Sequence, residues 1–160
     1  MTLFDQNRYA TKFLVGWRAM DFNGHMANTA YLDLAADARI SFFAEHGFPS
    51  SEFRRLAIGP VIQKEELEYF REVLLHDIVT VTYAVLAMSS DGARFAIENE
   101  IWSATGERAA TVRSTGGWLD LRARKLVVPP PALLEVFKQV PHAPGFAELP
   151  SLSGRSRETS

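Results

Sequence analysis

The chain has 160 residues, 47% of them hydrophobic, with a formal net charge of −2 and a sequence pI near 6.1. This length fits one domain with its own core and is short for two. The charge gives no overall attraction to nucleic acid or to an anionic membrane, and the absence of cysteine excludes disulfides, thiolate zinc sites and cysteine nucleophiles.

The sequence carries no signal for a membrane, a metal or a phosphate loop. No apolar run approaches the ~18 residues needed to span a bilayer, and the first residues lack the apolar segment of a secretory signal. We therefore expect a cytoplasmic protein that binds neither membranes nor nucleic acid. The four histidines are scattered without ligand spacing, which predicts no metal site.

A strand is predicted over residues 11–18, because TKFLVGWR has strand propensity, and it leads to Asp21 at the strand end. A long helix follows, with Asn28 or Thr29 as its N-cap and Gly47 as its stop. This helix is apolar around most of its circumference, apart from a narrow polar stripe that includes Asp33 and Asp37. It should therefore be covered on several sides.

The rest of the chain reads mainly as strands. Residues 48–56 suggest an irregular or short helical connection, and Pro129–Pro131 introduce a short amphipathic helix. Gly116 and Gly117 indicate a bulge or a close backbone approach in the last strand. Alternating or β-branched patterns predict strands over residues 58–73, 78–88, 94–102 and 108–121, the last three forming an antiparallel meander. We expect one domain over residues 1–140 and a loose tail over 141–160.

This order predicts an α+β fold in which one antiparallel sheet curls around one long helix, the arrangement called the hotdog fold. One segment of the chain contains Asp21, Gly24, His25, Asn28, Tyr31 and Arg39. This set of residues resembles the signature of the 4-hydroxybenzoyl-CoA thioesterase-like family, and the looser similarity runs from about residue 11 to Pro131.

The chain departs from the family pattern at a few positions. The family has two aspartates flanking one residue, and Ala19 replaces the first of them. A helix glutamate five residues after the tyrosine is replaced by Ala36, with Asp37 one place later and rotated ~100° around the helix. Ala27 and Thr29 flank Asn28 where the family has an Asn-Asn pair.

The resemblance implies an acyl-CoA thioesterase with Asp21 as its catalytic aspartate. Thioester hydrolysis needs a nucleophile, direct or as activated water, and donors for the developing oxyanion. Asp21 could attack the carbonyl or deprotonate water, and the sequence does not separate these roles. Backbone amides between Gly24 and Asn28, at the start of the helix, are the predicted oxyanion donors, and Gly24 would allow close substrate approach.

Further residues are assigned to catalysis or to substrate binding, each with a structural alternative. His25 could bind substrate, shuttle a proton or act as a structural donor, and Asn28 could cap the helix or contact substrate. Met26 and Tyr31 are expected to bind substrate, although Tyr31 could equally be core. Arg124 and Lys125, next to Arg122, could bind the phosphates of coenzyme A or simply lie on the surface.

Two other functions remain open, a hotdog hydratase or dehydratase of acyl thioesters and a noncatalytic binder of acyl or aromatic ligands. The close spacing of Asp21 and His25 differs from the wider Asp and His spacing of the enoyl hydratases. The resemblance also implies a homo-oligomer, dimer or tetramer, because hotdog subunits join their sheets edge to edge. No cofactor is expected beyond the CoA carried by the substrate.

Overall fold

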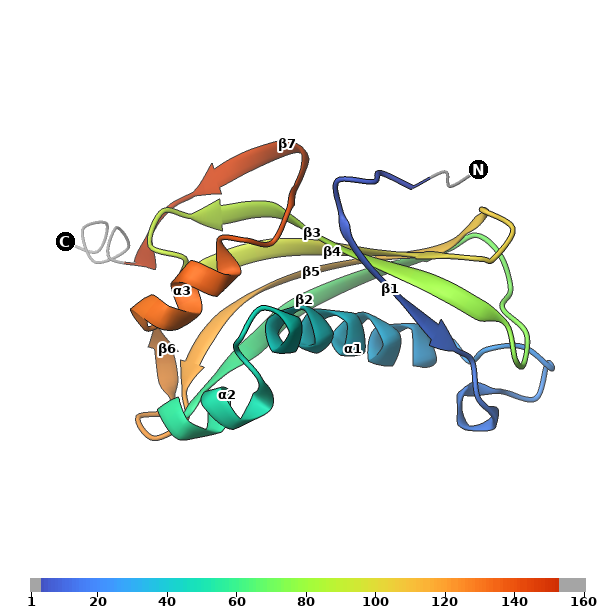
Figure 1. Cartoon of the computed structure of the whole chain (residues 1–160), viewed down its shortest axis with the longest axis horizontal. Helices are drawn as coiled ribbons and strands as arrows, with labels where there is room; N and C mark the ends of the chain where they lie inside the picture. Colours follow the sequence, from blue (N-terminus) through green and yellow to red (C-terminus); the bar gives the residue numbers. More distant parts are fainter. Residues whose placement is uncertain (1–3, 153–160) are drawn as a thin grey trace.

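The computed structural model describes residues 4–152, in which a curled sheet wraps around the long helix α1 (Ala30–Glu45) (Figure 1). Two short helices, α2 and α3, lie near the C-terminal end of α1. The other elements are β1 (Tyr9–Leu14), the 3-10 turn η1 (Trp17–Ala19), α2 (Ser50–Leu56), β2 (Ile58–Tyr69), β3 (Ile78–Ser89), β4 (Arg94–Trp102), β5 (Arg108–Asp120), β6 (Lys125–Val127), α3 (Pro131–Phe137) and β7 (His142–Leu149).

The sheet has the strand order β1-β3-β4-β5-β2, and every neighbouring pair along this path is antiparallel. The meander of β3, β4 and β5 is confirmed, as is the predicted sheet curled around one helix. Strand β2 pairs only with β5 among the described residues, so its other edge is free. A register shift between Ile62 and Lys64 bends this edge strand.

Two predictions about the ends of the chain are wrong. The first strand ends at Leu14, and η1 and an isolated bridge between Met20 and Met26 connect it to the helix, so Asp21 lies in a loop. The supposedly loose tail contains β7, which pairs in parallel with β3, and its Phe146 packs on the core. Edge pairing orders this segment despite its glycine and prolines; residues 153–160 lie outside the described part.

The glycine pair in β5 provides a close backbone approach, one of the two predicted alternatives. A Cβ built on Gly116 would lie 1.9 Å from the carbonyl oxygen of Val61 in β2. A Cβ on Gly117 would lie 2.8 Å from the carbonyl oxygen of Ala93. These glycines therefore allow β5 to approach β2 closely on one side and the residue preceding β4 on the other.

The core falls into two clusters along α1. Around the C-terminal half of α1, Phe42 and Phe43 pack with aromatic residues such as Trp118 and Phe137. Around its N-terminal half the cluster is mostly aliphatic and small, with Ala35 and Ala38 fully buried against the sheet. The aromatic half holds large interlocking rings, whereas the other half brings the backbone of α1 close to the strands.

The helix is less enclosed than the sequence predicts. Ala36 and Ile40 lie on a flank of α1 that is exposed in the single chain, and Ile40 is 43% exposed. Thr29 is the N-cap as predicted, but its side chain makes no capping hydrogen bond. Gly47 follows the end of the helix with φ of +81°, the left-handed conformation expected of a glycine stop.

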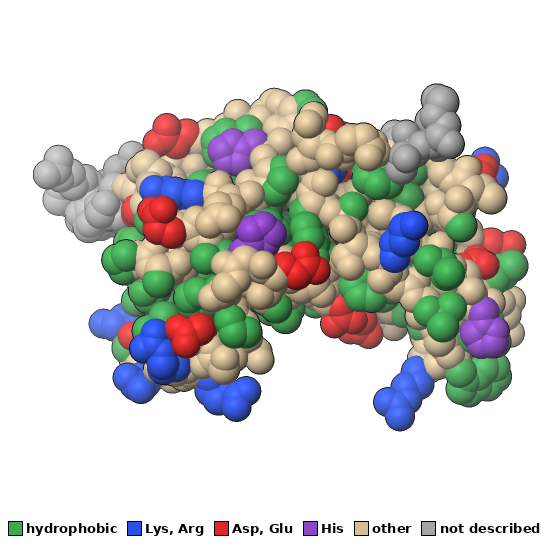
Figure 2. Space-filling model, in the orientation of Figure 1, with side chains coloured by type: hydrophobic (Ala, Val, Ile, Leu, Met, Phe, Trp, Pro, Cys, Tyr) green, Lys and Arg blue, Asp and Glu red, His purple; other side chains and the backbone are tan. Residues whose placement is uncertain are grey.

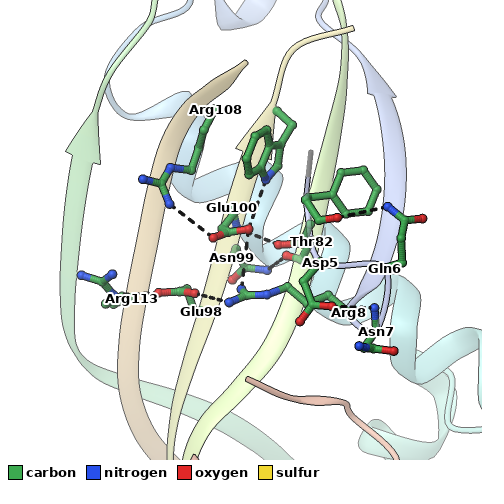
Figure 3. A network of polar contacts seen from close by, with 12 residues as sticks. Asp5, Gln6, Asn7, Arg8, Thr82, Glu98, Asn99, Glu100, Arg108 and Arg113 are labelled. Atoms are coloured by element: carbon green, nitrogen blue, oxygen red, sulfur yellow. Dashed lines mark hydrogen bonds and ion pairs between the residues drawn. The ribbon is translucent and has the colours of Figure 1, made fainter. Parts of the chain in front are cut away.

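The face of the sheet turned away from α1 carries a network of charged side chains (Figure 3). Glu98 of β4 lies 2.7 Å from Nη2 of Arg8 and accepts a hydrogen bond of 2.7 Å from Nε of Arg113. Glu100 accepts hydrogen bonds from Trp102 and Arg108. The Arg8 and Glu98 side chains are only 8% and 7% exposed, so the N-terminal segment seals this network against the sheet.

Candidate active site

The loop between η1 and α1 is anchored to its neighbours by backbone hydrogen bonds. The amide of Met26 donates to the carbonyl of Val73 at 2.7 Å, and the amide of Ala27 donates to the carbonyl of Ala19 at 2.7 Å. The Met26 side chain is 1% exposed and thus acts mainly as a core anchor, although it also borders the pocket described below. The loop is therefore tied to η1 and to the segment between β2 and β3, and these bonds fix its position at the start of α1.

Gly24 makes the turn at the tip of this loop possible. It has φ of +78°, a conformation that side chains strongly disfavour, and its amide donates to the carbonyl of Asp21 at 3.3 Å. The amide of Asp21 in turn donates to the carbonyl of His25 at 3.0 Å. The sequence Asp-Phe-Asn-Gly-His thus closes on itself, and the carboxylate of Asp21 is held at its base.

The two carboxylate oxygens of Asp21 have different surroundings. Oδ1 accepts a hydrogen bond from the amide of Asn23 at 2.8 Å. Oδ2 lies 3.7 Å from Nδ1 of His25, too far for a hydrogen bond, and that nitrogen lies 3.3 Å from the carbonyl oxygen of Met26. The side chain of Asp21 is 27% exposed. One oxygen therefore orients the carboxylate, and the other is available to a ligand.

Most amides in the predicted oxyanion segment are already used within the protein. Those of Gly24, Met26 and Ala27 donate to the carbonyls described above or within the turn. In the part of the chain that the structure describes, the amides of His25 and Asn28 have no acceptor. Asn28 therefore provides a backbone donor at the start of α1, while its carbonyl accepts a hydrogen bond from the hydroxyl of Tyr69 at 2.9 Å.

An open pocket of about 500 Å³ lies next to these groups. Tyr31 is buried and meets Tyr69 edge to face, with 5.1 Å between ring centroids. Burial, and after it the nearby Tyr69, Asp21 and Glu72, raise the pKa of Tyr31, so its hydroxyl stays protonated and can donate. The lining residues come from the loop, from α1 and from the end of β2: Asp21, Asn23, His25, Met26, Asn28, Tyr31, Tyr69, Phe70, Arg71 and Glu72. We call this the Asp21 pocket.

The basic residues predicted to bind CoA do not lie in this pocket. Arg124 and Lys125 are exposed in and after the turn between β5 and β6. This turn lies beside α2, since the amide of Leu121 donates to the carbonyl of Ala57, and Figure 1 places both at the opposite end of α1 from the Asp21 loop. Basic side chains gather at that end in Figure 2. In one chain, therefore, Asp21 and the basic pair are not brought together.

Arg39 has a role that the sequence pattern alone did not reveal. It lies on α1, is 9% exposed, and donates from Nε to Asn99 at 2.9 Å and from Nη2 to Ser114 at 2.9 Å. Its Nη1 lies 3.7 Å from Glu65, whereas Asp33 and Asp37 remain exposed on the helix. Burial lowers the pKa of Arg39, partly offset by Tyr83 and Glu65. This arginine joins the helix to the sheet.

The described part of the chain has neither a clustered metal site nor a membrane-spanning helix. Among residues 4–152 there is no group of three or more histidine, aspartate or glutamate side chains placed to hold a metal ion. No helix in this range is long and apolar enough to cross a membrane.

A curled antiparallel sheet wrapped around one long helix is the hotdog fold. Residues 15–137 match the family model described as the thioesterase-like superfamily. The chain belongs to this superfamily. The match includes the whole Asp21 loop, α1 and the meander.

Individual relatives agree with this assignment. An Agrobacterium fabrum protein, L-carnitine dehydrogenase/betainyl-CoA thioesterase, is 26% identical over 151 residues, which cover 91% of this chain but only 30% of the relative. The chain thus spans about a third of the length of that curated relative.

Solved structures show the same fold. A Staphylococcus aureus hypothetical protein in complex with CoA has a TM-score of 0.72 and 21% identity, covering 85% of this chain and 87% of that one. A 1,4-dihydroxy-2-naphthoyl-CoA thioesterase from Synechocystis has a TM-score of 0.73 and 14% identity, covering 85% and 99%. At these identities the likeness is one of fold.

Proposed function

We propose that this protein is an acyl-CoA thioesterase that hydrolyses a thioester to a free acid and CoA. The observation that carries the proposal is the pairing, at one pocket, of a carboxylate oxygen without a hydrogen bond and a backbone amide without an acceptor. Oδ2 of Asp21 and the amide of Asn28 are these two groups, and both residues line the Asp21 pocket. Thioesterase-like family membership and a thioesterase-named relative support the same reaction.

The proposed chemistry uses the two groups on opposite sides of the substrate carbonyl. The amide of Asn28, at the start of α1, stabilises the negative charge that develops on the carbonyl oxygen. Oδ2 of Asp21 either accepts a proton from an attacking water or attacks the carbonyl carbon itself, and water then releases the acyl group. In both routes the carbon–sulfur bond breaks, CoA leaves as its thiol, and one water is consumed.

Other residues have supporting roles in this proposal. Gly24 and His25 hold the loop shape, and His25 also borders the pocket where it can contact the substrate. The protonated hydroxyl of Tyr31 can donate to the bound thioester. No cofactor beyond the CoA of the substrate is needed for this chemistry, and we propose that the reaction takes place in the cytoplasm.

We also propose that the functional unit is a homodimer formed along the free edge of β2. An unpaired edge strand exposes backbone donors and acceptors that a second strand can satisfy. A two-fold axis at the middle of β2 would pair it with its own copy in antiparallel fashion and extend the sheet across both chains. Sedimentation equilibrium tests this, and a monomer at micromolar concentration would contradict it.

The function is tested by measuring thiol release from a panel of acyl-CoA substrates. The panel contains acetyl-, isovaleryl-, benzoyl- and palmitoyl-CoA, together with betainyl-CoA and 1,4-dihydroxy-2-naphthoyl-CoA, which appear in the names of relatives. We expect release of CoA from at least one of these at a rate well above the uncatalysed one. Hydration of crotonyl-CoA without thiol release would favour the hydratase alternative, and tight binding with neither reaction would favour the noncatalytic binder.

A further inference from the structure

A second pocket, of about 450 Å³, lies between the N-terminal segment and the face of the sheet turned away from α1. Its volume falls in the range of about 300–1,000 Å³ that small-molecule sites occupy. It shares no lining residue with the Asp21 pocket, and α1 contributes none, so it is a separate site. We call it the Trp102 pocket, and its principal residues are Phe4, Gln6, Lys12, Ile78, Thr80 and Trp102.

The register of three strands sets an ammonium, a hydroxyl and an indole side by side in this pocket. Thr80 of β3 lies opposite Trp102 of β4 on one side and opposite Lys12 of β1 on the other. Residues directly opposite each other in antiparallel strands point to the same face of the sheet. Trp102 follows Glu100 by two residues along β4, so this row shares the outer face with the charged network.

The aromatic walls of the Trp102 pocket are held in place by other contacts. The indole N–H of Trp102 donates to Oε2 of Glu100 at 3.1 Å, and the rings of Trp102 and Phe4 lie 6.2 Å apart at 48°. The side-chain amide of Gln6 donates to the carbonyl of Phe4 at 3.1 Å. Arg8 fastens the same segment to the charged network (Figure 3). Because these walls are already ordered, a ligand would bind without the cost of arranging them.

The polar groups that this pocket leaves available suit a carboxylate. Of the described residues that line it, Lys12 alone is charged, and its ammonium makes no ion pair with any of residues 4–152. Within the same range, the hydroxyl of Thr80 makes no hydrogen bond, whereas the indole N–H of Trp102 is already used. An ammonium and a hydroxyl on paired residues can donate to the two oxygens of one carboxylate.

We propose that the Trp102 pocket binds a free aromatic monocarboxylate. Its ring packs against Trp102, Phe4 and Ile78, and its carboxylate accepts hydrogen bonds from Lys12 and Thr80. The site goes beyond the proposed thioesterase activity, because it takes a free acid and lies apart from Asp21. A thioesterase releases free acids, so an aromatic product would belong to the class that this pocket binds.

The first test locates a bound acid with the tryptophans as reporters. The chain has three tryptophans, so their indole N–H groups give three signals in a proton–nitrogen NMR spectrum, and Trp102→Phe assigns the one at the pocket. We expect sodium benzoate, titrated at constant ionic strength, to shift the Trp102 signal with a dissociation constant on the order of 1–10 mM. The signals of Trp118, in the core, and Trp17, beside the Asp21 loop, report binding elsewhere. A Trp102 signal that does not shift would overturn the site.

The second test separates the ring of the ligand from its charge. Benzamide keeps the ring without the charge, and acetate keeps the carboxylate without the ring. Because the pocket uses both, each should bind several-fold more weakly than benzoate at the Trp102 signal. Benzamide or acetate binding as tightly as benzoate would overturn the proposed ligand class.

Substitutions then test the two polar groups. Lys12→Gln removes an exposed charge and should weaken benzoate binding about fivefold while leaving benzamide binding nearly unchanged. Thr80→Val keeps the branched shape without the hydroxyl and should weaken benzoate binding at least about twofold. The matched control is Lys138→Gln, which changes an exposed lysine at the end of α3, outside the pocket. Benzoate binding that is unchanged in both pocket variants, or equally weakened in the control, would overturn the assignment.

These binding measurements need no catalysis, so their outcome is distinct from that of the proposed function. A protein that binds benzoate at the Trp102 signal but releases no thiol from any acyl-CoA supports this site and contradicts the thioesterase. An active thioesterase in which benzoate leaves the Trp102 signal unshifted contradicts this site, while the proposed function stands.

Discussion

Asp21 and Glu98 are two carboxylates in contrasting regions of the same molecule. Glu98 is 7% exposed in the network on the outer face of the sheet, and arginines engage both of its oxygens. Asp21 lies in an open loop where only one oxygen has a hydrogen bond. The comparison shows that a fully paired carboxylate holds elements together, whereas a half-paired one beside a pocket is available for chemistry.

The largest stability effect should follow removal of the charge on Glu98. Glu98→Gln leaves the buried Arg8 with Glu100 as its remaining counterion, 3.9 Å away, and should cost about 3 kcal/mol of unfolding free energy. Urea unfolding measures this. The control is Glu52→Gln, which removes an exposed pair with Arg55 and should leave the unfolding free energy nearly unchanged. Equal losses of stability in the two variants would show that the buried ion pairs of Glu98 contribute no more than the exposed pair of Glu52.

The same network predicts a pH dependence. Burial raises the pKa of Glu98, but hydrogen bonds and charges from Arg113 and Arg8 outweigh it and hold the pKa below the ordinary 4.5. A lowered folded-state pKa contributes stability above the unfolded value, and that stability is lost as pH falls through the folded value. The difference in unfolding free energy between wild type and Glu98→Gln should therefore become smaller below about pH 4.5. A difference that stays constant down to about pH 3 would contradict this.

On the inner face of the sheet, Arg39 of α1 is the buried charged group that holds the polar side chains of the strands. Arg39→Met leaves the buried Asn99 and Ser114 without their donors and should cost about 2 kcal/mol of unfolding free energy. The matched control Arg54→Met changes an exposed arginine on α2 and should have little effect. A neutral Arg39→Met would show that packing alone joins α1 to the sheet.

The smallest effect should appear at the tip of the Asp21 loop. Gly24 has φ of +78°, so Gly24→Ala should cost about 1 kcal/mol and shift the carboxylate enough to slow thiol release. Gly16→Ala is the control, because Gly16 has φ of −93° and open space where the added Cβ would lie. The two variants are compared by thermal unfolding and by thioesterase rate, and indistinguishable results would mean that the loop tolerates a side chain.

The sequence was informative where local pattern determines structure. The helix from Ala30, the meander, and the positions of Asp21 and Gly24 in one turn followed from periodicity, turn residues and family resemblance. These features depend on residues close together in the chain. The adjacent glycines of β5 predicted a bulge or a close backbone approach, and the structure shows the close approach, to Val61 of β2 and to Ala93.

Apart from the end of the first strand, which lies at Leu14, the misses concern contacts between residues distant in the sequence. Strand β1 pairs with only the first part of β3, and β7 pairs with the remaining part of that edge. No local sequence pattern indicates this pairing. Arg39 carries part of the family resemblance, but its partners Asn99 and Ser114 are 60 and 75 residues away. Likewise, Arg124 and Lys125 looked suitable for CoA by composition, and only the fold shows that they lie far from Asp21 in one chain.

The central claim is that the free oxygen of Asp21 performs the chemistry at the start of α1. The most direct measurement is the steady-state rate of thiol release by wild type, Asp21→Asn and Glu98→Gln with the best substrate of the panel. We predict that Asp21→Asn lowers kcat about 10²- to 10⁴-fold while its unfolding free energy stays nearly unchanged, and that folded Glu98→Gln keeps the wild-type rate. A folded Asp21→Asn protein that releases CoA at the wild-type rate would contradict the account.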